Sequence, residues 1–213
     1  MFEPGCTRAW CLADGIAVSP AGVTADDVGA LREALKAVAV RLKEGGFAFA
    51  LAGGYAAWAR GAPEPGHDVD FILASTEVER ARAYLAESGL KIVQPPEDWL
   101  FKVFAGEAMV DLIHRMGAEP VENGWLDDAN EVEVLSVLMP VMSATQIIKS
   151  KVRVLDEHDC DYSSLLPVTR ALREQVDWDE VSRYCDGNPY AAAFLFLLKR
   201  LGVAPNGGAE QSP

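Results

Sequence analysis

The sequence predicts an α+β protein: a mixed β-sheet with helices packed on it, followed by a C-terminal helical bundle. Phe47–Leu51 alternates large apolar residues with alanine, as expected for a central strand buried on both faces. A second apolar strand is expected in the stretch 67–73, which contains two carboxylates near its start. After residue 140, four segments in a row carry helix caps or helical spacing of apolar residues, with short connections between them.

Composition shifts divide the chain into four parts. Residues 1–22 are punctuated by glycine and proline and are predicted to form an N-terminal arm. Residues 23–140 contain the predicted sheet and form the core, and residues 141–203 form the helical region. Residues 204–213 hold few apolar side chains, so they are predicted to be a disordered tail.

The core is predicted to begin with a helix that starts at Thr24 and ends at the glycine pair 45–46. A capping box formed by Thr76 and Glu79 predicts a second helix, and Gly89 suits the position just after its end. Further strands are predicted at Leu90–Val93, Leu100–Phe104 and Met109–Ile113, with a hairpin turn at 105–107, and at Val132, Val134 and Val137, where Pro140 ends the strand.

The helical region is predicted to open with a capping box formed by Ser143 and Gln146, and this helix should run to about Asp156. Asn188 precedes Pro189, which is well suited to a first helical turn. The three remaining helices are predicted at Leu165–Val176, Trp178–Cys185 and Pro189–Leu201.

The charge of the chain argues against two classes of partner. Its formal net charge is −13, with a pI near 4.6, so its long-range field repels phosphate. We therefore expect no non-specific binding to nucleic acid and no membrane association. The sequence also lacks a secretory signal and an apolar run long enough to span a bilayer, which predicts a cytoplasmic protein. The four cysteines lack zinc-site spacing and are expected to be free thiols.

Two short motifs carry the chemistry. Asp68 and Asp70 stand two apart in a strand, so both carboxylates project from the same face. Such a pair is costly unless a cation lies between them, and oxygen ligands without His or Cys suit Mg²⁺ or Mn²⁺. Gly53 and Gly54, between a strand and a helix, let the backbone N–H groups approach a phosphate. Together the motifs predict an enzyme that handles a nucleoside triphosphate.

The order of these motifs resembles a known family. Gly53-Gly54, a short helix, a gap and then Asp68-Val-Asp70 are similar to the signature of the DNA polymerase β-like nucleotidyltransferases. The small bacterial branch, with the aminoglycoside and lincosamide nucleotidyltransferases and the AbiEii-type toxins, is the most similar. The resemblance runs from about Phe47 to Leu201. It implies transfer of a nucleoside monophosphate from an NTP to a hydroxyl acceptor, with release of pyrophosphate and with Mg²⁺ or Mn²⁺ as cofactor.

A third carboxylate is needed near the first pair for a two-metal site. Asp111 is a lone charge within an apolar strand pattern that is expected to lie beside the Asp68-Val-Asp70 strand. The resemblance implies that Asp111 helps to hold the metal or takes the proton of the acceptor. The alternative is an acidic residue at a strand end that faces water.

Two lysines are candidates for binding the triphosphate. Lys149 and Lys151 stand two apart on a predicted helix, so they cannot share a face. Lys151 resembles the nucleotide-binding lysine of the toxin-like branch and is the preferred candidate. Lys149 instead forms a basic stripe with Arg153. A solvent-exposed role remains an alternative for each lysine.

Two further candidates flank these elements. Residues 158–161 are similar to a shortened form of the Arg-Asp-x-x-Asp segment of AbiEii-like proteins, although the arginine is absent. Asp161 could brace Lys151 or face the acceptor. His67 could touch a phosphate, or it could be a hydrogen-bonded neighbour of the carboxylates.

The sequence leaves the acceptor open. A cationic small molecule, the end of an RNA such as tRNA and a protein side chain are all compatible with the motifs, and the acidic surface favours the first. The lysine-bearing helix is slightly more similar to the toxin-type branch, which implies an antitoxin as partner. A nucleotide-binding module without turnover is the alternative to an enzyme, but the intact carboxylates argue against it.

Overall fold

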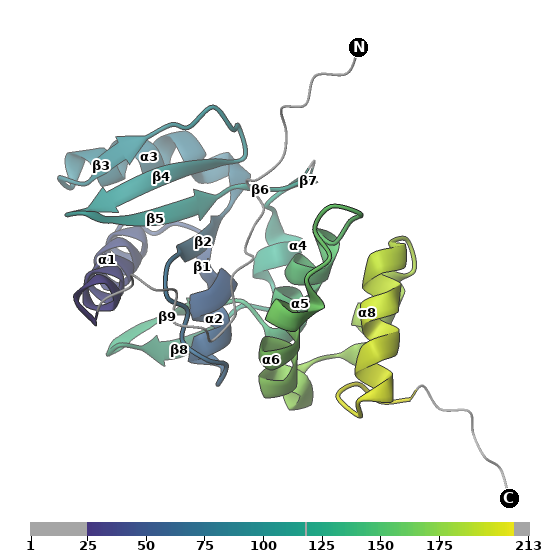
Figure 1. Cartoon of the computed structure of the whole chain (residues 1–213). Helices are drawn as coiled ribbons and strands as arrows, with labels where there is room; N and C mark the ends of the chain where they lie inside the picture. The colour runs from purple at the N-terminus through teal and green to yellow at the C-terminus, as the bar shows by residue number, and fades with distance from the viewer. Residues whose placement is uncertain (1–24, 118, 207–213) are drawn as a thin grey trace, which may run out of the picture.

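The core of the protein is a seven-stranded mixed sheet with the strand order β3-β4-β5-β2-β1-β9-β8 (Figure 1). The computed structural model describes residues 25–117 and 119–206. Two pairs of strands, β2 with β5 and β1 with β9, are parallel, and the other neighbours are antiparallel. In sheet order the strands are Lys91–Val93, Leu100–Ala105, Ala108–Ile113, Val69–Leu73, Phe49–Ala52, Val137–Val141 and Asn130–Val134.

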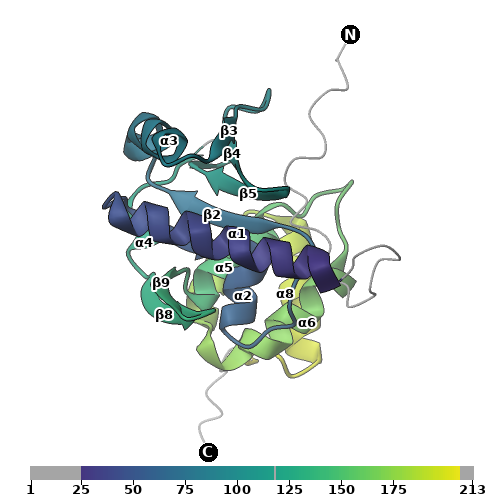
Figure 2. The same ribbon diagram turned by 90° about the vertical axis from the view of Figure 1, so that its left-hand side faces the viewer.

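Helices lie on both sides of this sheet. In Figure 2 the long helix α1 (Ala25–Glu44) runs in front of β2, and in both views the C-terminal helices lie on the side away from it. Helix α2 (Gly53–Ala59) follows β1 directly and packs on β2 and on α5. The other helices are α3 (Val78–Glu87), α4 (Asn123–Leu126), α5 (Ala144–Arg153), α6 (Tyr162–Leu172), α7 (Trp178–Cys185) and α8 (Pro189–Arg200).

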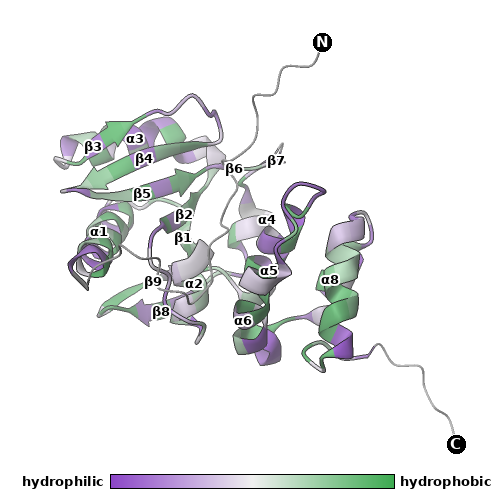
Figure 3. Cartoon of the chain, in the orientation of Figure 1, coloured by the Kyte–Doolittle hydropathy of each residue, from purple (hydrophilic) through white to green (hydrophobic). Residues whose placement is uncertain are grey.

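The two faces of the sheet differ in polarity. Phe101, Leu112 and Phe71 lie in register on neighbouring strands, and all three are fully buried. The next row, on the opposite face because side chains alternate along a strand, holds charged residues. Figure 3 shows mainly hydrophobic strands interrupted by hydrophilic bands, as in β5. The α+β prediction is therefore confirmed, including the neighbouring positions of the two acidic strands.

The strand predicted through residues 132–137 is wrong, because this segment is a hairpin of β8 and β9. Leu135 and Ser136 form its turn, with φ angles of 52° and 65°. Glycine or asparagine usually marks such a turn, and neither is present here. Pro140 lies inside β9, opposite Glu131, rather than ending a strand.

Other predicted boundaries also need correction. Thr76 does not cap α3, since a 3-10 turn over Ser75–Glu77 precedes this helix and no side chain caps it. The helix expected to reach Asp156 ends at Arg153. Helix α6 begins at Tyr162 rather than at Leu165, because Asp161 accepts a hydrogen bond from the backbone N–H of Ser163 and so caps the helix earlier.

Three predicted helix ends are confirmed. Ser143 accepts a hydrogen bond from the Gln146 N–H, and Asn188 caps α8. Gly89 has a φ of +85° just after α3, as predicted.

Ala204 is buried, so it belongs to the packed structure rather than to the predicted tail. The predicted arm, Thr24 and residues 207–213 lie outside the described residues.

The core and the helical region are joined by Arg60, which directly follows α2. Its guanidinium donates to the backbone oxygens of Val141 (2.9 Å) and Met142 (2.5 Å) and to the side chain of Asn130 (2.6 Å). Gln175 in turn donates to the Arg60 backbone oxygen at 2.9 Å. Arg60 therefore fixes α2 against the point where β9 leads into α5. No helix in the described part of the chain is long and apolar enough to cross a membrane.

The β8–β9 turn gives a test of the fold. Ser136 is exposed and has a positive φ, so Ser136→Gly should relieve backbone strain and raise the free energy of unfolding by about 0.5–1 kcal/mol. The matched control is Ser182→Gly inside α7, which should lower it by about 0.5 kcal/mol. Urea unfolding of both variants measures the difference, and equal effects would contradict the assigned turn.

Candidate functional site

A row of charged side chains crosses the centre of the sheet. Asp70 on β2 is in register with Asp111 on β5, and Asp111 is in register with Lys102 on β4. On the other side, Ala52 of β1 pairs with Asp70 and leads into Gly53. Registered residues project from the same face of a sheet, so the row brings both acidic strands and the start of α2 to one place.

Asp70 is the most buried charged residue of the row. Asp70 is only 4% exposed, and its Oδ2 has no hydrogen-bond partner among the described residues. Burial is the main reason that the pKa of this carboxyl rises to about 7, and the charges of Asp111 and Asp68 raise it further. Lys151 and Lys102 oppose this rise. A buried, unpartnered carboxylate oxygen is costly, and a bound cation would relieve that cost.

Gly53 lies directly against this carboxylate. A Cβ at position 53 would come within 2.0 Å of Asp70 Oδ2, and the φ of Gly53 is +61°, which side chains rarely tolerate. A Cβ on Gly54 would come within 2.9 Å of Pro65 in the loop before β2. Glycine is thus required at 53 by the closeness of Asp70 and at 54 by the closeness of the loop.

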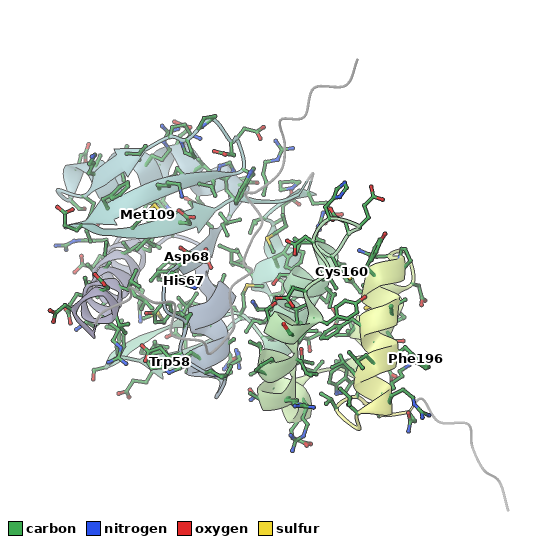
Figure 4. The ribbon with its side chains drawn as sticks, viewed as in Figure 1. Trp58, His67, Asp68, Met109, Cys160 and Phe196 are labelled. Atoms are coloured by element: carbon green, nitrogen blue, oxygen red, sulfur yellow. The ribbon has the colours of Figure 1, made fainter. Side chains whose placement is uncertain are left out.

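Asp68 lies just before β2 and is open to solvent. Its side chain is 49% exposed, and His67 Nδ1 lies 3.6 Å from its Oδ2. Figure 4 places His67 and Asp68 together beside α2, near the centre of the view. The charge of Asp68 contributes to the raised pKa of both Asp70 and Asp111. The structure therefore brings Asp68 into the same electrostatic environment as the other two carboxylates, with His67 at its edge.

The two candidate lysines lie in different environments. Lys151 is 7% exposed; burial lowers its pKa, and the charge of Asp70 counteracts that effect. Lys149 instead donates to Glu180 at 2.7 Å and lies over the rings of Trp125 and Tyr184. The structure thus brings Lys151 near the carboxylates, and it turns Lys149 toward α7.

A small pocket lies between the end of α5 and the start of α6. Lys151, Asp159, Asp161 and Ser164 line it, together with Val154, Leu155 and Leu165. Asp161 does not pair with Lys151 in an ion pair; its Oδ1 accepts from the N–H and the hydroxyl of Ser163, and these bonds lower the pKa of the carboxyl. Asp161 therefore has a helix-capping role and also faces the pocket that Lys151 lines.

Lys102 is the member of the row that sequence reasoning missed. Its ammonium donates to Asp111 Oδ1 at 2.9 Å and to Oδ2 at 3.2 Å. Burial raises the pKa of Asp111, and the hydrogen bond from Lys102 lowers it. Lys102 interrupts the apolar pattern of β4, and this interruption is the signal in the sequence that could have marked it as a site residue. Only the register of β4 on β5, however, shows that Lys102 faces Asp111.

The carboxylates fit a magnesium-type ion in their chemistry, since all the donors are oxygens and one buried oxygen of Asp70 has no partner. Asp68, Asp70 and Asp111 would hold the ion. Within residues 25–117 and 119–206, however, no three His, Cys, Asp or Glu side chains are arranged so that they could hold a metal. Asp111 is bound to Lys102 and Asp68 points to solvent, so side-chain rotation is needed before all three could act as ligands.

The raised pKa of Asp70 predicts a dependence of stability on pH. An acid whose pKa is about 7 in the folded chain and 3.8 unfolded keeps its proton longer when folded. The free energy of unfolding of wild type therefore falls as pH rises from about 4 to about 7. In EDTA, the free energy of unfolding of Asp70→Asn should not fall in this way, so its difference from wild type should grow by on the order of 2–4 kcal/mol between pH 4 and pH 8. Urea unfolding at both pH values measures it, and parallel pH profiles would contradict the assignment.

The contact between Gly53 and Asp70 gives a second prediction. Gly53→Ala should lower the free energy of unfolding by about 2–4 kcal/mol, since the new methyl group meets the carboxylate and the φ is unfavourable. Gly29→Ala on the exposed side of α1 is the matched control, because a Cβ there meets nothing within 4 Å. That control should be neutral or slightly stabilising in thermal unfolding.

Comparison with known proteins places this geometry in a structural class. No protein-family model matches the sequence, and the search of curated proteins found no match. Among solved structures, ANT(2″)-Ia in complex with adenylyl-2″-tobramycin is similar, with a TM-score of 0.55 and 16% identity over 76% of this chain and 95% of that one. An antigenic nucleotidyltransferase-like protein from Paracoccidioides brasiliensis has a TM-score of 0.56 and 11% identity over 84% and 90%. The chain therefore has the nucleotidyltransferase fold that its glycine and aspartate motifs predicted.

Proposed function

We propose that this protein is a metal-dependent nucleotidyltransferase, which moves a nucleoside monophosphate from an NTP to a hydroxyl acceptor. The observation that carries the proposal is the buried, unpartnered Asp70 oxygen, which lies against Gly53 and in register with Asp111. A carboxylate this costly to bury has no evident structural role, since it makes no hydrogen bond through that oxygen with any described residue. On a nucleotidyltransferase fold, the same arrangement suits a metal and a triphosphate.

The residues divide into three groups in the proposed reaction, which bind the metal, bind the triphosphate and face the acceptor. Asp68 and Asp70 hold Mg²⁺ or Mn²⁺, which, when bound, neutralises charge on the phosphates during transfer. Gly53 and Gly54 leave room for the triphosphate beside the start of α2, and the ammonium group of Lys151 faces the phosphates from α5. Asp111 lies on the far side of Asp70 from the glycines, which supports a role for Asp111 on the acceptor side of the site.

The transfer step makes one bond and breaks one. The acceptor hydroxyl oxygen bonds to the α-phosphorus, and the bond from that phosphorus to the oxygen bridging the β-phosphate breaks with its electron pair. Pyrophosphate leaves, and the acceptor proton passes to Asp111 or, if Asp111 serves as a metal ligand, to water. Positioning and electrostatics supply most of the rate in such a reaction, so the fixed register of β2 on β5 matters more than any single proton transfer.

For the acceptor, we propose a cationic small molecule. The net charge of −13 attracts such a molecule and repels RNA, and acidic residues line the pocket beside Lys151. One solved structure of this fold carries an adenylylated tobramycin. The toxin-type interpretation, with an RNA or protein acceptor and an antitoxin partner, depends on the sequence resemblance of the lysine-bearing helix and of residues 158–161. It stays a prediction, as does the cytoplasmic location.

Activity should depend on Asp70. With Mg²⁺, an NTP and a panel of acceptors, wild type should release pyrophosphate, whereas Asp70→Asn should lower kcat by at least about 100-fold while remaining folded. The panel should pair polyamine-like or aminoglycoside acceptors with tRNA, and mass spectrometry should show which one gains a nucleotide. Modification of tRNA alone would overturn the proposed acceptor class, and full activity of Asp70→Asn would overturn the metal assignment.

The two lysines of α5 form a natural matched pair. Lys151→Met should raise the KM for NTP by about tenfold or more with a smaller change in kcat, because a phosphate-binding charge acts in both ground and transition states. Lys149→Met removes the same charge two residues away, where Glu180 holds it, and should leave the KM within about twofold of wild type. Pyrophosphate release measured over a range of NTP concentrations separates the two. Equal effects would remove Lys151 from the nucleotide site.

A further inference from the structure

Lys102 is the one charged residue of the central row that the proposed transfer step does not use. It reaches Asp111 from the neighbouring strand β4, and its ammonium donates to both carboxylate oxygens, at 2.9 and 3.2 Å. Both side chains are largely removed from water, with exposures of 26% for Lys102 and 17% for Asp111. An ion pair in such surroundings is screened less by water than one on an open surface.

The pair leaves the two registered carboxylates in unequal states. Asp111 is bound through both of its oxygens, whereas Asp70, directly opposite it on β2, has a buried oxygen without a partner among the described residues. No three donor side chains in the described ranges are arranged to hold a metal. One of the three expected ligands is already occupied by a cation of the protein itself.

We propose that Lys102 takes the place of a metal ion at Asp111 in the metal-free protein, so that Asp111 becomes a ligand only after Lys102 leaves it. The inference rests on the proposed function and adds the order in which the three carboxylates bind the metal. Asp70 has one oxygen without a partner among the described residues, and Asp68 is open to solvent, so these two bind the metal first. Asp111 is available to a cation only in competition with the ammonium group. Lys102 is thus a positioning residue, which acts through Asp111 and touches no substrate.

A purely structural role for this ion pair makes a different prediction. If Lys102 served only to stabilise β4 against β5, its removal would lower the stability of the sheet and leave metal affinity unchanged or lower. If it competes with metal, its removal must increase metal affinity, because a ligand oxygen is released. Metal affinity without nucleotide therefore separates the two roles independently of turnover.

The test is a titration with Mn²⁺ alone, followed by calorimetry or by the electron paramagnetic resonance signal of free Mn²⁺. Lys102→Met keeps the length of the side chain and removes its charge, and it should bind Mn²⁺ about fivefold to tenfold more tightly than wild type. Lys91→Met is the matched control. It removes one lysine charge from exposed β3, where Lys91 lies over the Phe104 ring, and should change the affinity by less than about twofold.

Lys102→Arg provides the second variant. It keeps a cation that can contact both oxygens of Asp111, so its Mn²⁺ affinity should equal that of wild type or fall below it. Tighter binding by Lys102→Met and not by Lys102→Arg supports the proposal. Unchanged or weaker binding by Lys102→Met, or equally tight binding by both variants, overturns it.

Thermal unfolding covers the case in which Lys102→Met is unstable without metal. Because bound metal stabilises the folded state according to its affinity, Mn²⁺ should raise the Tm of Lys102→Met more than that of wild type, measured against EDTA. A smaller or equal rise overturns the proposal. Wild type that binds no Mn²⁺ and transfers no nucleotide overturns the proposed function itself, whereas an active wild type with unaltered Lys102→Met affinity overturns only the role of Lys102.

Discussion

The site depends on the placement of two carboxylates in register on adjacent, parallel strands. Asp70 and Asp111 are brought together by the β2–β5 pairing, where repulsion and loss of hydration both oppose ionisation. Fully apolar rows on the opposite face, such as that of Phe71 and Leu112, hold the strands in this register. A slip of either strand by one residue would turn its acid into the apolar core, so the apolar packing on one face fixes the register of the charged row on the other.

Much of this arrangement could be predicted from the sequence, because its signals are local. The glycine pair, the paired acids and the lone Asp111 each interrupt an apolar pattern, and helix caps at Ser143 and Asn188 are read directly from residue type. The β8–β9 hairpin could not be predicted in the same way. Its turn has positive φ at Leu135 and Ser136, two residue types that rarely adopt this conformation. The pairing of β8 with β9 stabilises the hairpin enough to offset this backbone strain.

Lys102 and the two candidate lysines show a second limit of sequence reasoning. Helical spacing established that Lys149 and Lys151 point in different directions, but it could not say which direction faces the carboxylates. That choice depends on how α5 packs on α2 and α7, a long-range feature. The partnership of Lys102 with Asp111 likewise comes from strand register, which connects residues on either side of a hairpin turn.

The Arg60 contacts have a consequence for how such a chain can diversify. Two of its hydrogen bonds go to backbone oxygens of Val141 and Met142, which every residue type possesses. The junction therefore places little demand on the side chains that follow it. Substitutions at Ser164 and Leu165 of α6 can therefore reshape the pocket that Lys151 lines without removing these backbone contacts. The helical region can therefore change its pocket-lining residues over generations while the glycine and aspartate positions of the sheet stay fixed.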